Sequence, residues 1–296
     1  MSSSDFPSRV IRCLGAQDGS LQLVERLGNE RADRVTWAAR SDELGEVVVK
    51  ARYRDRAPEK TRWCATTLPL LGARGYPVPE YLWHGALDQS WYLAVQRRLP
   101  GSPVIALDPG LIDELTSLVE LQADASVAPA HHDMAAYHAL VLFEGWDHVW
   151  RDAEMASAEA RDVCERIRLV LRPVWGHRLV GDDFAHGDLN LSNVLHDGTH
   201  ITGVVDWDHF GLNSRAADLT SILFDWLRLH GETSIVLDSE SRRLLDRIAT
   251  IAGEPGLRCV VAYAAVGRLA SAQRRGDDDM LASWITVTDR LFEAIT

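Results

Sequence analysis

The stretch from residue 186 to residue 218 constrains the fold of this chain more than any other part of it. It reads HGDLNLSNVLHDGTHITGVVDWDHFGLNSRAAD. Two short apolar runs, residues 193–196 and 200–205, flank an Asp-Gly pair, and this pattern is typical of a β-hairpin. A hairpin folds its two far ends back beside each other, so the residues before its first strand and after its second must meet.

Three polar side chains lie at or near the ends of the predicted hairpin that come together. Asn193 and Asp206 lie at its far ends, and Asp188 lies on the loop that enters it. Two carboxylates and an amide oxygen suit a hard cation that keeps part of its water, as Mg²⁺ does when it is held through substrate phosphates. The Asp nearest the loop tip can also accept the proton of an attacking hydroxyl. The stretch therefore predicts Mg²⁺-assisted phosphoryl transfer, which needs these parts in one place.

The order His-Gly-Asp, with Asn five residues after the Asp, fits the form of a kinase catalytic loop. With the Asp-Trp-Asp triplet at 206–208, the stretch resembles the catalytic segment of the aminoglycoside phosphotransferase family of small-molecule kinases. This resemblance implies an α+β, bilobal protein-kinase-like fold, with a small antiparallel β-sheet N-lobe and a mainly helical C-lobe. It implies Asp188 as the catalytic base and Asn193 and Asp206 as Mg²⁺ ligands. It also gives supporting roles to three further residues, His186, Asp208 and Asp218.

The division into lobes is expected near residue 101. The run 97–101 reads RRLPG and resembles the family's hinge, where Arg97 and Leu99 would hold the adenine through their backbones. Formal charge changes sign here, from +3 before Pro103 to −15 after it, although solubility alone explains the acidic part equally well. We expect a nucleotide-binding N-lobe at 1–101 and a C-lobe with the catalytic loop and acceptor site at 102–296.

The N-lobe is predicted from strand-like runs at residues 21–27, 35–39, 46–51 and 91–96. Lys50 ends the third run and is one of only two lysines in the chain. The resemblance implies that it binds the α- and β-phosphates of ATP or GTP; a lysine reaching solvent from an edge strand is the alternative. Gly28 and Asn29 stand where the phosphate-covering loop would lie. Glu59, on the helix predicted at 58–71, is the candidate partner of Lys50 but stands early in that helix.

The C-lobe pattern is helical. Asp108-Pro109 caps one helix, and Ser157 begins another that is predicted to kink at Pro173. Further helices are expected at residues 215–230, 239–251, 257–274 and 278–295.

Acceptor-binding residues are expected in the C-lobe, among aromatic and acidic side chains. Carboxylates favour a cationic aminosugar or a basic peptide, whereas tryptophans favour stacking on a nucleobase or on an apolar macrolide-like face. Any one of these side chains has an alternative place in the core or on a solvated surface. The candidates are Glu144, Trp146, Asp147, Trp150, Trp207 and Trp284.

Other partners are disfavoured by the composition. The sequence contains no basic stripe that could neutralise a nucleic-acid backbone. It also contains no run of about 18 apolar residues, the length needed to span a membrane. The four cysteines form no Cys-x-x-Cys pair, so neither zinc nor a disulfide framework is indicated. We therefore expect a cytoplasmic protein.

The sequence thus predicts an ATP- or GTP-dependent O-phosphotransferase that modifies a hydroxyl of a small molecule, most plausibly an antibiotic. Aminoglycoside, peptide, macrolide and nucleoside antibiotics all remain open as acceptors. One alternative is a metabolic kinase for choline, homoserine or a thio-sugar. Another is a pseudokinase that binds nucleotide without turnover.

Overall fold

The computed structural model describes residues 6–15, 20–31, 33–55, 57–124, 133–144, 147–177, 181–230 and 237–296, and the side chains of residues 6, 7, 15, 29–31 and 147 are outside this description. The chain divides into two compact units, which are described separately. The first comprises Met1–Ser102, Leu195–Gly198 and Thr202–Val205. The second comprises Pro103–Val194, Thr199–Ile201 and Asp206–Thr296.

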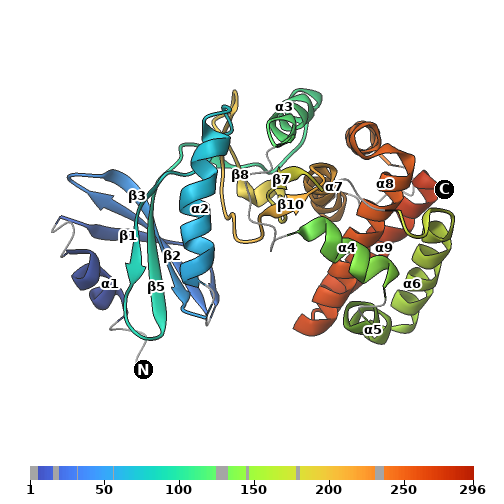
Figure 1. Ribbon diagram of the computed structural model, residues 1–296, viewed down its shortest axis with the longest axis horizontal. Helices are drawn as coiled ribbons and strands as arrows, with labels where there is room; N and C mark the ends of the chain where they lie inside the picture. Colours follow the sequence, from blue (N-terminus) through green and yellow to red (C-terminus); the bar gives the residue numbers. More distant parts are fainter. Residues whose placement is uncertain are drawn as a thin grey trace. The chain divides into compact units, whose positions relative to one another are not determined.

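The first unit contains a five-stranded antiparallel sheet with the strand order β1-β2-β3-β5-β4 (Figure 1). Its strands are β1 (Gln22–Arg31), β2 (Arg34–Ser41), β3 (Gly45–Tyr53), β4 (Tyr81–Ala86) and β5 (Trp91–Arg97). The four predicted runs correspond to β1, β2, β3 and β5, although β1 begins one residue after the start of its predicted run. β1 runs further than the pattern predicted, so residues 28–31 belong to a strand rather than to a loop.

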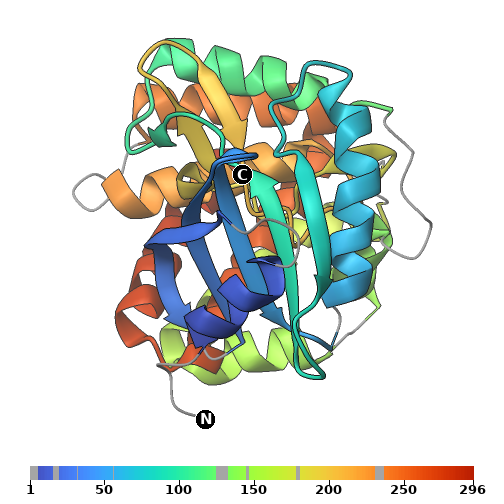
Figure 2. The ribbon, with the colours of Figure 1, turned by 90° about the vertical axis from the view of Figure 1, so that its left-hand side faces the viewer.

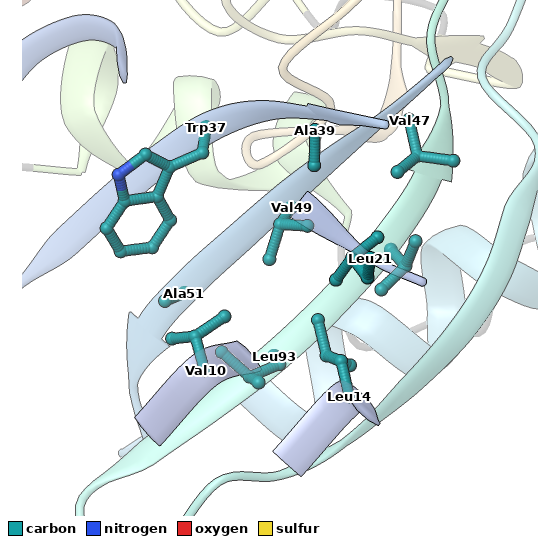
Figure 3. Close-up of a cluster of buried hydrophobic side chains, with 10 residues drawn as sticks. Val10, Leu14, Leu21, Trp37, Ala39, Val47, Val49, Ala51 and Leu93 are labelled. Atoms are coloured by element: carbon teal, nitrogen blue, oxygen red, sulfur yellow. The ribbon is translucent and has the colours of Figure 1, made fainter. Parts of the chain in front are cut away.

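One face of this sheet is covered by α1 (Phe6–Gly15), which lies across the strands in Figure 2. Val10 and Leu14 of α1 pack on Val49 and Ala51 of β3, and all four side chains are at most 3% exposed (Figure 3). Successive side chains of a strand point to opposite faces, so Lys50 lies on the other face of the sheet. β3 is the central strand, which removes the edge-strand interpretation of this lysine.

The predicted hairpin forms from β8 (Val194–His196) and β9 (Ile201–Val204), in a three-stranded sheet with β6 (Ser102–Pro103). Most of this hairpin belongs to the first unit, where it packs on the segment expected to be the hinge. Thr202 Oγ1 donates a hydrogen bond to the Pro100 carbonyl at 2.6 Å. A Cβ on Gly203 would lie 2.7 Å from Leu99 Cδ1, so a larger residue here would force Leu99 to shift.

The second unit is mainly helical. Its helices are α3 (Pro109–Glu120), α4 (Met134–Phe143), α5 (Asp147–Ala156), α6 (Ala158–Leu171), α7 (Ala216–His230), α8 (Ser239–Arg275) and α9 (Asp278–Ile295). Within the described part of this unit, α8 packs against α5, α7 and α9 (Figure 1). Asp108 and Ser157 cap α3 and α6 by accepting hydrogen bonds from Leu111 N and Ala160 N.

Two helix boundaries depend on proline and glycine. α8 contains both helices predicted at 239–251 and 257–274, and Gly253 between them has φ 68° and ψ 168°, outside the helical region. The prediction at Pro173 is corrected: α6 ends at Leu171, and Pro173 lies in the following 3₁₀ turn, Arg172–Val174. Proline lacks the N–H that would continue an α-helix, so the helix ends there instead of kinking.

The predicted fold class, an antiparallel sheet region followed by a mainly helical part, is confirmed. Within the described ranges, no helix is both long and apolar enough to cross a membrane.

Candidate active site

Two short antiparallel strands of the second unit bring together the loops that carry the candidate residues. β7 (Asp183–Ala185) ends directly before His186, and β10 (Gly211–Asn213) begins directly after Phe210. Ala185 pairs with Gly211, so the loop that follows β7 and the loop that precedes β10 start from neighbouring strand ends. The β8–β9 hairpin links two further candidate residues, because Asn193 directly precedes β8 and Asp206 closely follows β9.

Gly187 allows these two loops to touch. Its φ is +79°, in the region that favours glycine, and a Cβ built there would lie 2.0 Å from the carbonyl oxygen of His209. The contact leaves no space for a side chain between Gly187 and the loop that contains Asp206 and Asp208.

We expect Gly187→Ala to lower the free energy of unfolding by about 2 kcal/mol or more, because a side chain there adds both backbone strain and a clash with backbone. Urea unfolding measures this change. Gly176→Ala is the matched control, since Gly176 has a similar φ of +81° but nothing within 4 Å of a Cβ. Equal losses in the two variants would show that the contact with His209 does not matter.

Asp218 fixes the start of the candidate catalytic loop. It is fully buried in the first turn of α7, and its carboxylate accepts hydrogen bonds from His186 N at 2.7 Å, Gly187 N at 2.9 Å and Gln122 Nε2 at 2.9 Å. Burial raises the pKa of Asp218, while the neighbouring His186 and the three donated hydrogen bonds act in the opposite direction. This carboxylate therefore supplies the hydrogen-bond acceptor that the two backbone N–H groups would otherwise find in water.

His186 lies beneath the loop. It is fully buried, its ring centroid is 4.6 Å from that of Trp207, and its Nδ1 accepts a hydrogen bond from Asp188 N at 3.3 Å. Trp207 is only 2% exposed and also stacks on Phe184. Trp207 therefore lies in the core that supports the loop, and not on an open surface as an acceptor wall would.

Asp188 and Asn193 are joined through the backbone. Asn193 Nδ2 donates to the carbonyl oxygen of Asp188 at 2.9 Å, and Asn193 is 9% exposed. No residue in the described ranges donates a hydrogen bond to the Asp188 carboxylate, which is exposed. Nor does the Asn193 amide oxygen accept one from this part of the chain. Both side chains thus keep oxygen atoms available on a fixed backbone.

Asp206 has an unusual backbone conformation, with φ +66°. Non-glycine residues in this region are strained, and such residues concentrate at functional sites. Asp208 N donates to the carbonyl oxygen of Asp206 at 2.8 Å, which closes a tight turn between the two acids.

The donor set fits Mg²⁺ that is held partly by a substrate. In the ranges that the structure describes, no three His, Cys, Asp or Glu side chains gather closely enough to hold a metal ion. One amide and one carboxylate leave most coordination positions to phosphate oxygens and water, which is how Mg²⁺ commonly binds at kinase sites.

A second acid that braces the loop was missed in the sequence. Asp225 Oδ2 accepts a hydrogen bond from Leu191 N at 3.1 Å, and its Oδ1 accepts one from Arg228 Nη2 at 2.9 Å. Asp225 lies seven residues after Asp218 on α7, so both acids are on one face of the helix. This spacing was visible in the sequence and could have predicted that both acids hold the same loop.

The candidate nucleotide residues lie in the first unit. Lys50 is 9% exposed, and Gly28 has φ +71° within β1. Arg97 ends β5, where its Nε donates to Glu80 Oε2 at 2.8 Å, and Leu99 packs on the β8–β9 hairpin. Glu59 is exposed in the first turn of α2 (Ala57–Gly72). The Asn29 side chain is outside the described residues.

The candidate acceptor residues do not form one surface. Trp150 is 7% exposed, its Nε1 donates to the Val141 carbonyl, and it lies in the core between helices. Glu144 is exposed at the end of α4. Trp284, on α9, is 9% exposed and packs near Phe224 of α7. Trp146 and the Asp147 side chain lie outside the described residues.

Comparison with solved structures supports the same fold. The aminoglycoside phosphotransferase APH(4)-Ia is 17% identical with a TM-score of 0.70, covering 97% of this chain and 98% of that one. The macrolide 2'-phosphotransferase MphH from Brachybacterium faecium is 18% identical with a TM-score of 0.59. The match covers 97% of this chain and 98% of that one. The amicoumacin kinase hAmiN is 11% identical with a TM-score of 0.66 over the whole of both chains.

A search of curated proteins found no match to the sequence. The sequence profile of the phosphotransferase enzyme family matches residues 24–249, which contain most of the predicted strands of the first unit and the whole catalytic stretch. The resemblance seen in the sequence is thereby confirmed. The chain belongs to the phosphotransferase enzyme family that includes the aminoglycoside phosphotransferases, and it is a small-molecule kinase.

Proposed function

We propose that this protein transfers the γ-phosphoryl group of ATP or GTP to a hydroxyl of a small molecule, with Asp188 as the base. One observation carries this proposal: the Asp188 carboxylate is exposed and accepts no hydrogen bond from the described chain, while its backbone is held on both sides. A carboxylate that is free to accept a proton, on a loop that cannot move far, suits a group that orients an attacking hydroxyl.

In the proposed reaction, Asp188 accepts the proton of the acceptor hydroxyl as its oxygen bonds to the γ-phosphorus. The bond from that phosphorus to the β–γ bridging oxygen breaks, and the nucleoside diphosphate leaves with that electron pair. Lys50 would bind the α- and β-phosphates, and Asn193 and Asp206 would hold Mg²⁺. When bound, Mg²⁺ neutralises phosphate charge.

An antibiotic is the proposed acceptor. Structures similar to this chain include an aminoglycoside phosphotransferase in complex with ADP and hygromycin B, a macrolide 2'-phosphotransferase, and an amicoumacin kinase in complex with AMP-PNP, Ca²⁺ and its antibiotic. These three proteins are described with different antibiotics. The shared fold thus supports the class of reaction more strongly than any single acceptor.

A screen of acceptors tests the proposal. The protein is incubated with Mg²⁺ and ATP or GTP, together with an aminoglycoside, macrolide, peptide or nucleoside antibiotic, or with choline, homoserine or a thio-sugar. We expect release of nucleoside diphosphate, and a mass gain of one phosphoryl group on an antibiotic, both abolished by a chelator. Transfer to a metabolite alone would replace the proposal with a metabolic kinase. Nucleotide binding without turnover on any acceptor would favour a pseudokinase.

A further inference from the structure

Arg268 of α8 places a partly buried positive charge in the helical unit that carries the catalytic loop. Its guanidinium carbon lies 4.6 Å from the ring centroid of Phe224 and 5.3 Å from that of Trp284. Such contacts with two aromatic faces stabilise a cation and restrict its orientation. No motif in the sequence indicated this residue, because its segment was predicted only as a helix at residues 257–274.

The hydrogen-bond partners of Arg268 are all neutral. They are the Ala264 carbonyl at 3.3 Å, the Ser221 carbonyl at 3.4 Å and the Ser221 hydroxyl at 3.3 Å. Among the residues the structure describes, no carboxylate forms an ion pair with Arg268. Arg228, which faces the same Trp284 ring, instead pairs with Asp225 at 2.9 Å. A partly buried charge without an ionic partner is costly, so a bound anion would stabilise it.

Part of the Arg268 guanidinium remains open. Its Nε makes no hydrogen bond in the described chain. The Nε atoms of Arg215, Arg243 and Arg258 also lack a partner there and are fully buried, whereas the Nε of Arg268 is not fully buried. An arginine that offers an accessible N–H beside further N–H groups matches the shape of a carboxylate or phosphate.

Arg268 lies beside the helix that braces the catalytic loop. It donates hydrogen bonds to Ser221 of α7, which stands between Asp218 and Asp225, the two acids that accept hydrogen bonds from that loop. Burial lowers the pKa of Arg268 to about 10, and the carboxylates of Asp188 and Asp225 oppose this by raising it. Arg268 is therefore still protonated at neutral pH. This charged guanidinium contacts α7, the helix whose Asp218 holds the loop of Asp188, where an acceptor hydroxyl would bind.

We propose that Arg268 forms an oxyanion-binding site beside Asp188. This inference rests on the proposed function for the reaction. It adds the charge of the group that binds beside Asp188. The oxyanion is either the phosphoryl group being transferred or a carboxylate or phosphate on the acceptor. In both cases, an ammonium group next to the reacting hydroxyl is disfavoured, so a polycationic aminoglycoside suits this position poorly.

Sulfate is the probe for this site. Its affinity is measured by calorimetry at constant ionic strength for the wild type, Arg268→Met, Arg268→Lys and the control Arg274→Met, which alters an exposed arginine of the same helix paired with Asp152. We expect sulfate affinity to fall about tenfold or more in Arg268→Met, to fall less in Arg268→Lys, and to stay unchanged in the control. Sulfate binding that is undetectable in the wild type, or equal in Arg268→Met, would overturn the proposal.

Bound nucleotide distinguishes the two sources of the oxyanion. If Arg268 binds the transferring phosphoryl group, Mg²⁺ with AMP-PNP will abolish the Arg268-dependent sulfate binding, and Mg²⁺ with ADP will not. If Arg268 binds an acceptor group, sulfate will bind equally well with either nucleotide. Sulfate binding to the protein without nucleotide requires no catalysis, so it separates failure of this site from failure of the kinase proposal.

Discussion

Replacing Asp188 with alanine is expected to lower the rate of phosphoryl transfer about a thousandfold while nucleotide still binds. The substitution removes the free carboxylate without disturbing the loop, because the hydrogen bonds to His186 and Asn193 use only the backbone of Asp188. The loss should therefore appear in turnover and not in folding.

Turnover of the Asp188→Ala protein is measured as acceptor-dependent release of nucleoside diphosphate, and nucleotide affinity is measured separately by calorimetry. Asp182→Ala, which removes an exposed carboxylate just before β7, is the matched control and should retain the wild-type rate. Turnover of Asp188→Ala within a few fold of the wild type would refute the role of this residue as the base.

Replacing Asp218 with alanine is expected to lower the free energy of unfolding of the helical unit by about 3 kcal/mol or more. The substitution leaves the N–H groups of His186 and Gly187, and the amide of Gln122, buried without their acceptor. Because these donors lie in the buried or partly buried interior, each one left unpaired costs free energy. The catalytic loop should also lose its position, so transfer falls together with stability.

Urea unfolding, followed by circular dichroism, measures this loss. Asp162→Ala, which removes an exposed acid from α6, is the control and should change stability little. Asp218→Asn is the more sensitive test, since its amide NH₂ group cannot accept a hydrogen bond from either backbone N–H. If Asp218→Asn had wild-type stability and turnover, the bracing role of Asp218 would be wrong.

The two substitutions should therefore give different results. Asp188→Ala is expected to be stable and inactive, because its side chain makes no hydrogen bond within the described chain. Asp218→Ala is expected to be unstable and inactive, because its side chain holds two backbone groups. This difference separates a residue that contacts the acceptor from one that positions it.

The local elements could be predicted from the sequence alone. Asp-Gly between two apolar runs predicted the β8–β9 hairpin, and Asp108 and Ser157 marked the starts of α3 and α6. These features depend on residues within a few positions of each other, so turn chemistry, capping and periodicity suffice to predict them. The spacing of His186, Asp188 and Asn193 also led to the correct family, since one short loop carries that motif.

Contacts between residues far apart in the sequence could not be predicted in this way. Arg268 stands eighty positions after Asp188, and no local pattern indicates that, among the described residues, no carboxylate forms an ion pair with it. The exposure of tryptophans was equally undecided: Trp150 and Trp207 fit an acceptor wall by composition, yet both are buried. Burial and ion pairing depend on how helices far apart in the sequence pack together. Periodicity predicts which face of a helix is apolar, but it does not predict which element packs against that face.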